Sequence, residues 1–95
     1  SDIEQSFYTK LSENTYLFDG KTHLNDFLKV LSFDEDYLDE AKGEAETLAG
    51  LMLEIRKDFL RRGETLAYRR LTLRVDAMDG RRIDKIRVTV ADSED

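Results

Sequence analysis

The sequence predicts an α+β domain in which two helices pack on one face of a small, mainly antiparallel sheet, in the order β-α-α-β-β-β. Three observations support this class. Apolar residues recur with helical spacing in two segments before residue 60. After residue 64 they alternate with polar residues, as in strands that bury one face. The dipeptide Asp79-Gly80 then favours a hairpin between the last two strands.

The length of 95 residues indicates a single domain with a modest core. We expect residues 1–14 to form a loosely ordered polar lead-in, residues 15–91 the folded domain, and residues 92–95 a frayed tail. The chain begins at Ser1 without a methionine, so we expect it to be a piece of a longer protein.

The first strand and the first helix are predicted from adjacent patterns. Residues 15–18 form a short apolar strand, which the turn dipeptide Asp19-Gly20 ends. Thr22 is a candidate helix N-cap, because its hydroxyl can accept from a free backbone N–H of the first turn. The helical stripe that follows consists of Leu24, Phe27, Leu28 and Leu31.

An acidic segment separates this helix from the second. Residues 32–46 have Phe33, Tyr37 and Leu38 as their large apolar side chains, and a helical turn is expected around residues 36–41. Thr47 is the expected cap of the second helix, and Gly63 its expected end. Its stripe is expected in the core, with an interface as the alternative; it comprises Leu48, Leu51, Met52, Ile55 and Phe59.

The remaining residues predict three antiparallel strands. Residues 65–68 form a short one, and residues 71–77 alternate cleanly between apolar and polar side chains. In the last strand Ile86, Val88 and Val90 are in phase, whereas Ile83 is one residue out of phase. A β-bulge near Asp84-Lys85 accounts for this shift.

The net charge of −6 argues against general nucleic-acid binding, which requires a basic footprint. The charge is uneven: residues 1–50 carry twelve acids and four bases, and residues 51–95 carry nine acids and eleven bases. Such a dipolar chain favours charge pairing within or between proteins. No apolar run approaches the roughly 20 residues that span a bilayer, and no signal peptide is visible, so no direct membrane insertion is expected.

The composition also excludes much chemistry. The chain contains no cysteine, and His23 is the single histidine, which excludes thiolate catalysis and multi-histidine metal sites. Asp34 and Asp36 superficially begin a calcium loop, but Leu38 stands where an oxygen ligand is needed. We therefore predict a non-enzymatic domain without a cofactor or a specific metal site.

The most promising functional side chains are two arginine pairs. They flank the strand that begins at Leu71, and they could bind phosphate or a partner's carboxylates. The alternative is that they are exposed strand-end arginines that keep a sheet edge soluble. The candidate contact surface therefore comprises Arg69, Arg70, Arg81 and Arg82, with Asp34, Asp36, Asp39 and Glu40 as the complementary acids.

Three segments together resemble the transporter-associated domain of the CorC/HlyC family. They are residues 16–20 (Tyr-Leu-Phe-Asp-Gly), residues 47–54 (Thr-Leu-Ala-Gly-Leu-Met-Leu-Glu) and residues 78–83 (Met-Asp-Gly-Arg-Arg-Ile). The resemblance covers residues 14–90, and residues 42–46 are most similar to the gliding-motility-associated branch. The family usually has a proline before the glycine that follows the second helix. Its absence here predicts a longer second helix.

The resemblance implies a fold similar to a subdomain of FAD-binding proteins, without implying FAD binding. It also implies a regulatory or accessory domain of a membrane ion transporter, of the magnesium and cobalt efflux or hemolysin-like kind. Such a domain would lie on the cytoplasmic face of the bacterial inner membrane. Its expected partners are upstream CBS-pair and transmembrane domains or a second copy, and nucleic acid is not expected. The alternative function is a small-ligand sensor that binds a nucleotide or a divalent cation between helices and sheet.

Overall fold

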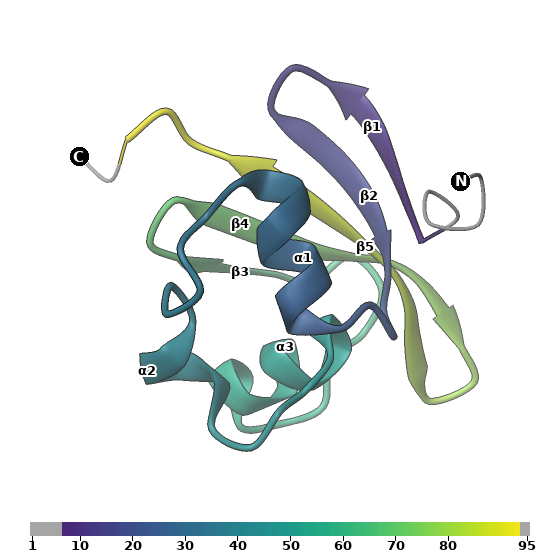
Figure 1. Cartoon of the computed structure of the whole chain (residues 1–95). Coiled ribbons are helices and arrows are strands. Elements are labelled where there is room, and N and C mark those ends of the chain that lie inside the picture. The colour runs from purple at the N-terminus through teal and green to yellow at the C-terminus, as the bar shows by residue number, and fades with distance from the viewer. Residues whose placement is uncertain (1–6, 94–95) are drawn as a thin grey trace.

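The computed structural model describes residues 7–93 and confirms an α+β fold (Figure 1). The structure has one more strand than predicted, which precedes the predicted first strand. The helical turn expected in the acidic segment is a short helix. In chain order the elements are β1 (Tyr8–Ser12), β2 (Thr15–Asp19), α1 (Leu24–Leu31), α2 (Asp39–Lys42), α3 (Leu48–Arg56), β3 (Thr65–Tyr68), β4 (Leu71–Asp79) and β5 (Arg82–Val90).

The five strands form one sheet in the order β1-β2-β5-β4-β3, and every neighbouring pair is antiparallel. The chain leaves the sheet after β2, builds the helices, and returns at the far edge as β3. The last strand, β5, then inserts between β4 and β2. Figure 1 shows the helices gathered on one side of the sheet, as the hydrophobic patterns predict.

The core lies between the helices and this face of the sheet. The rings of Phe18 from β2 and Phe27 from α1 meet edge to face, with centroids 4.9 Å apart. Burying such aromatic and aliphatic side chains is the main favourable term in folding. The other side chains with no exposed surface are Leu48, Leu51, Met52, Leu73, Val75, Ile86 and Val88.

The expectation of a loosely ordered lead-in is wrong for residues 8–12, which form β1. Tyr8 pairs with Phe18 in the register, and their rings stack with centroids 5.5 Å apart. The backbone amide of Asp19 also donates to the carbonyl of Phe7 at 2.8 Å. These contacts with β2 stabilise a strand that local sequence does not reveal. Residues 1–6 of the expected lead-in and residues 94–95 of the expected tail lie outside the described part of the chain.

The predicted cap of α1 is also wrong. His23 is the N-cap residue and makes no side-chain capping bond, whereas the buried Thr22 donates its hydroxyl to the carbonyl of Asp19 at 2.7 Å. Thr47 caps α3 as predicted, because its hydroxyl accepts from the amide of Gly50 at 3.1 Å. A bridge between His23 and Thr47 joins the starts of the two helices.

The second long helix, α3, ends earlier than expected. It stops at Arg56, and Lys57 turns left-handed with a φ of 61°. Leu60 then enters the core, while Phe59 is 83% exposed. The expected burial of Phe59 and the expected longer helix are therefore wrong. Gly63 lies in the turn before β3, where its amide donates to the carbonyl of Val75 at 2.7 Å.

The expected irregularity in β5 is confirmed. In the pairing of β4 with β5, two residues have no partner in the register: Asp84 of β5 and Asp76 of β4. The freed carbonyl of Asp84 accepts from the amide of Gly20 at 2.8 Å. A Cβ atom at position 20 would lie 2.0 Å from the carbonyl oxygen of Ile83. Glycine is therefore required where the turn after β2 packs against the β4–β5 hairpin.

Candidate functional site

The structure divides the predicted contact residues between the two ends of β4. Arg69 and Arg70 form the turn before this strand, whereas Arg81 and Arg82 lie in the hairpin after it. Figure 1 shows these two turns on opposite sides of the molecule. The nine residues of β4 separate them by about 26 Å along the strand. The four arginines therefore do not form one continuous surface.

At the first end, the arginine pair contacts the acidic segment of the same chain. The Arg69 guanidinium lies 4.1 Å from the centroid of the Tyr37 ring and donates to the Tyr37 carbonyl at 3.3 Å. The amide of Arg70 donates to the hydroxyl of the buried Tyr37 at 2.9 Å. Its guanidinium lies 5.1 Å from the Phe33 ring and donates to the carbonyl of Ala91 at 2.8 Å. These contacts tie the acidic segment to the sheet.

Three of the four predicted acids lie beside Arg69. Asp36, Asp39 and Glu40 line a shallow pocket with Arg69 and two tyrosines, whereas the exposed Asp34 does not line it. The structure thus brings the acids together with one arginine pair and not with Arg81 and Arg82. At this end the acids line the same pocket as Arg69 of their own chain. A contact role for these residues stays a prediction.

The second end of β4 borders an open groove of about 460 Å³ between α3 and the β4–β5 hairpin. We call it the hairpin groove. Its apolar lining comes from Leu53, Phe59, Leu60 and Ile83, and its basic lining from Lys21, Arg81 and Arg82. A second hollow of about 410 Å³ continues from it along Phe59 and Arg81 and is lined by Arg61 and Met78. Sequence reasoning identified Arg81 and Arg82 here but missed the apolar half.

Local backbone geometry keeps Phe59 outside the core. After the left-handed residue Lys57, the carboxylate of Asp58 accepts from the amide of Phe59 at 2.7 Å. The chain is then directed so that Leu60 is buried. Phe59 and Leu53, which is 42% exposed, flank the groove as a result. The one sequence signal was Asp58, a residue type that often bonds nearby backbone amides in turns.

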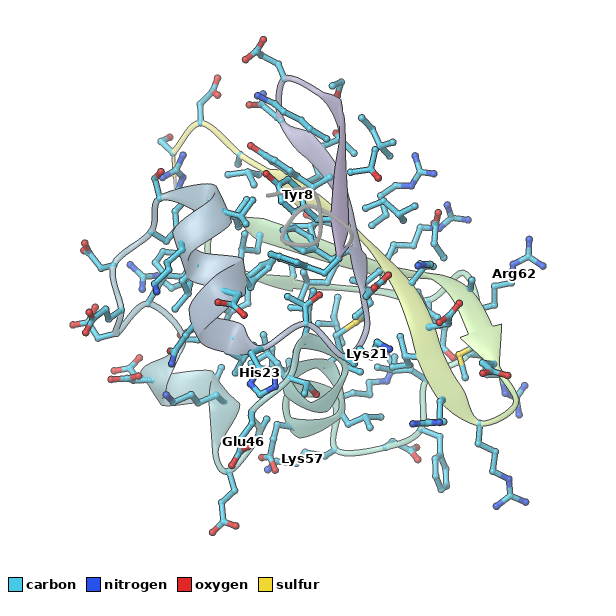
Figure 2. All side chains as sticks on the ribbon, turned by 45° about the vertical axis from the view of Figure 1, so that its right-hand side comes forward. Tyr8, Lys21, His23, Glu46, Lys57 and Arg62 are labelled. Atoms are coloured by element: carbon cyan, nitrogen blue, oxygen red, sulfur yellow. The ribbon has the colours of Figure 1, made fainter. Side chains whose placement is uncertain are left out.

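The groove cations differ from most others in the chain. Within residues 7–93, the side chains of Lys21, Arg61, Arg81 and Arg82 have no ion-pair partner. Elsewhere, Arg56 contacts Glu64 at 2.7 Å and Arg87 contacts Asp76 at 3.0 Å. Figure 2 shows Lys21 at the turn after β2, on the side facing the hairpin. The rim of the groove is therefore positive and available to an anionic partner.

A smaller polar pocket of about 250 Å³ adjoins the groove. Three acids (Asp19, Asp79 and Asp84) and three bases (Lys21, Arg82 and Lys85) line it, so it has no net preference for either sign of charge. Lys85 forms an ion pair with Asp19. The hydrogen bond that Lys85 donates to the Asp19 carboxylate raises the pKa of Lys85, partial burial opposes the shift, and the charges of Asp19 and Asp84 add to it.

The remaining candidates for a functional role are the single histidine, groups of metal ligands and membrane-spanning helices. The exposed His23 lies beside Glu46, where the segments leading into α1 and α3 meet (Figure 2). Among residues 7–93, the structure holds no group of three or more histidine, aspartate or glutamate side chains placed to bind a metal ion. Over the same residues, no helix is long and apolar enough to cross a membrane.

These features define a small α+β domain with an open groove beside the β4–β5 hairpin. Residues 9–92 match the transporter-associated domain family, CorC_HlyC. The chain belongs to this family, as its three motifs predict.

Solved structures show the same fold. The chain is similar to the transporter-associated domain of a CBS domain protein from Porphyromonas gingivalis, with a TM-score of 0.85 and 35% identity over 90% of this chain and 99% of that one. A corresponding domain of a Xylella fastidiosa hemolysin, in complex with Mg²⁺ and Mn²⁺, has a TM-score of 0.73 and 21% identity, covering 92% and 100% of the two chains.

Curated relatives are much longer proteins. The polyamine export protein of Escherichia coli K12 is 32% identical over 86% of this chain, which spans 18% of that protein. The magnesium and cobalt efflux protein CorC of Pasteurella multocida is 28% identical over 98% of this chain, which spans 32% of that protein. The chain therefore corresponds to one part of such proteins.

Proposed function

We propose that this chain is the regulatory or accessory domain of a longer membrane transporter of cations, and that it acts without catalysis, by protein–protein contact. The proposal rests on the similarity of this chain to one part of two longer export proteins. The similar part is 18% of the length of the polyamine export protein and 32% of the length of CorC. Their names indicate polyamines or magnesium and cobalt as substrates, all of which are cations.

The proposed contacts are with the upstream CBS-pair and transmembrane domains of the same chain, at the cytoplasmic face of the bacterial inner membrane. Self-association is a second possible contact. An exposed aromatic side chain, Phe59, next to cations that have no ion-pair partner within residues 7–93 supports contact as the mode of action. Interfaces typically combine a few such aromatic and arginine side chains at their centre.

Deleting the domain from the full-length transporter tests the proposal. The truncated transporter should reach the membrane in normal amount but export its cation at a changed rate or with changed dependence on cation concentration. Export of magnesium, cobalt and a polyamine should be measured separately in cells lacking the chromosomal copy. Unchanged export of all three, from a transporter present in equal amount, would contradict the proposal.

A small-ligand sensor is the second candidate, and the basic hairpin groove favours it because phosphate groups bind arginine and lysine well. The Xylella domain is described in complex with Mg²⁺ and Mn²⁺, whereas among residues 7–93 of this chain no group of three or more histidine, aspartate or glutamate side chains is placed to hold a metal ion. Thermal unfolding with magnesium, cobalt, ATP, AMP and FAD distinguishes the candidates. A bound ligand raises the melting temperature with concentration, and an unchanged temperature throughout contradicts the sensor.

A further inference from the structure

We propose that the hairpin groove docks an acidic peptide segment that carries a large apolar side chain and belongs to the same transporter chain. This inference rests on the proposed function, because it names the surface and the partner chemistry through which the domain would make its contact.

The apolar part of the groove would be covered best by an apolar side chain of the partner. Phe59 is 83% exposed and Leu53 is 42% exposed, and the two flank a depression in which Leu60 and Ile83 are almost fully buried. The backbone at Phe59 is held by the turn at Lys57 and by the Asp58 carboxylate, which accepts from the Phe59 amide. A partner that covers the ring therefore has only the side-chain rotamers of Phe59 to fix, and not its backbone. A nucleotide phosphate alone would leave this apolar half uncovered.

The charge of the rim selects an acidic partner. Lys21, Arg81 and Arg82 line the groove, and none has an ion-pair partner within residues 7–93. Among the described residues, no carboxylate lines the groove. The adjoining polar pocket shares Lys21 and Arg82 with the groove and is also lined by three acids, Asp19, Asp79 and Asp84. A segment with several acids around its apolar anchor matches this pattern, and a basic or neutral segment does not.

The same charges argue against a second copy as the occupant. In a symmetric dimer through this groove, the cations of one copy would face the identical cations of the other. A head-to-tail contact with the acidic segment of another copy would not give a two-fold dimer, because such contacts build rings or open chains of molecules. A segment of the same transporter chain avoids both problems. Its tether also raises the local concentration to the millimolar range, so weak contacts suffice.

Photo-crosslinking in the full-length transporter tests the inference. The variant Phe59→p-benzoylphenylalanine places a photoreactive group at the groove, and mass spectrometry identifies what it captures. We expect an adduct with an acidic, apolar-containing segment of the same chain. An adduct with a second copy, a basic segment or lipid would overturn the inference, and so would the absence of any adduct.

Matched variants separate docking from chance proximity. Arg81→Glu together with Arg82→Glu should reduce the adduct yield about tenfold, because like charges then meet at the rim. Lys29→Glu is the control, since Lys29 is exposed on α1 and lines neither the groove nor the adjoining hollows. Leu11→p-benzoylphenylalanine, at an apolar side chain that is 44% exposed on β1, should give no such adduct.

A synthetic peptide tests the recognition chemistry on this chain alone. The probe is a glutamate-rich peptide of about 12 residues with one phenylalanine and one leucine. It should shift the NMR signals of Gly20, Gly50 and Gly80, whereas peptides with lysine for glutamate, or serine for the two apolar residues, should not. Equal shifts with all three peptides, or shifts elsewhere, would contradict the inference.

The two proposals fail separately. If deletion of the domain leaves export unchanged, the proposed function fails whatever the crosslinking shows. If deletion changes export but Phe59 captures no acidic segment of the chain, the domain regulates transport through another surface and only the docking inference fails.

Discussion

Two arginine pairs at the two ends of β4 look alike in sequence but differ in their surroundings. Arg69 and Arg70 contact Tyr37, Phe33 and the backbone of the same chain. Arg81 and Arg82 border an open groove beside an exposed Phe59 and have no ion-pair partner within residues 7–93. The comparison shows that a basic dipeptide can stabilise a fold or remain available for binding. Which role it has depends on what the fold places next to it.

The largest expected effect is on the packing that forms the floor of the hairpin groove. Gly20→Ala would place a Cβ atom 2.0 Å from the backbone oxygen of Ile83, so the turn after β2 and the hairpin must separate. We expect the free energy of unfolding to fall by about 3 kcal/mol or more, measured by urea denaturation. Gly80→Ala is the control. It has a φ of +61° but no atom within 4 Å, and should cost about 1 kcal/mol. Equal losses would show that contact with the hairpin is not what requires Gly20.

The next effect concerns the start of β4, where Arg69 and Arg70 contact the acidic segment. Tyr37→Phe removes the hydroxyl that accepts from the amide of Arg70 at 2.9 Å and leaves this amide without its partner. We expect a loss of about 1–2 kcal/mol in the free energy of unfolding. Tyr16→Phe is the control, because no hydrogen bond of the Tyr16 hydroxyl is found within residues 7–93. If both variants unfold at the same urea concentration, Tyr37 does not hold the acidic segment through its hydroxyl.

A direct comparison of the two ends follows from single arginine substitutions. Arg69→Ser removes the stacking on Tyr37 and should cost about 1 kcal/mol. Arg81→Ser removes no hydrogen bond, ion pair or ring contact found within residues 7–93, and should change stability by less than about 0.5 kcal/mol. Thermal and urea unfolding of both variants measures the difference. A more destabilised Arg81→Ser than Arg69→Ser would reverse the roles that we assign to the two ends.

The sequence predicted the fold where patterns are local and repeated. The stripe of α1 and the alternation of β4 specified which face each element buries, and the phase shift at Ile83 located the bulge. The strand β1 was missed because its aromatic residues are stabilised by Phe18, a partner in another strand. Such a contact between strands has no period that can be seen within residues 8–12.

The hairpin groove could be predicted only in part. Helical periodicity selected Phe59 for the core, whereas the structure buries the adjacent Leu60 instead. The left-handed turn at Lys57 decides which of the two is buried, and nothing in the local sequence requires that turn. The groove also combines side chains from the turn after β2, from α3 and the loop after it, and from the hairpin. Arginine pairs are visible in a sequence, but their apolar neighbours become apparent only after folding.

The smallest expected effect concerns the ion pair between Lys85 and Asp19, next to the groove. The hydrogen bond with Asp19 raises the pKa of Lys85 in the folded state, so the pair stabilises the fold fully below the pKa of the unfolded chain, about 10.4. This stabilisation is lost as the pH rises through the higher folded-state pKa. Lys85→Met should therefore reduce the free energy of unfolding by about 0.5 kcal/mol at pH ~8, and the difference from the parent chain should shrink as the pH rises above the unfolded-state pKa of Lys85. Because both proteins share all other titrating groups, the change in this difference isolates the pair. A difference that stays constant or grows with pH would show that Lys85 acts through its packing and not through its charge.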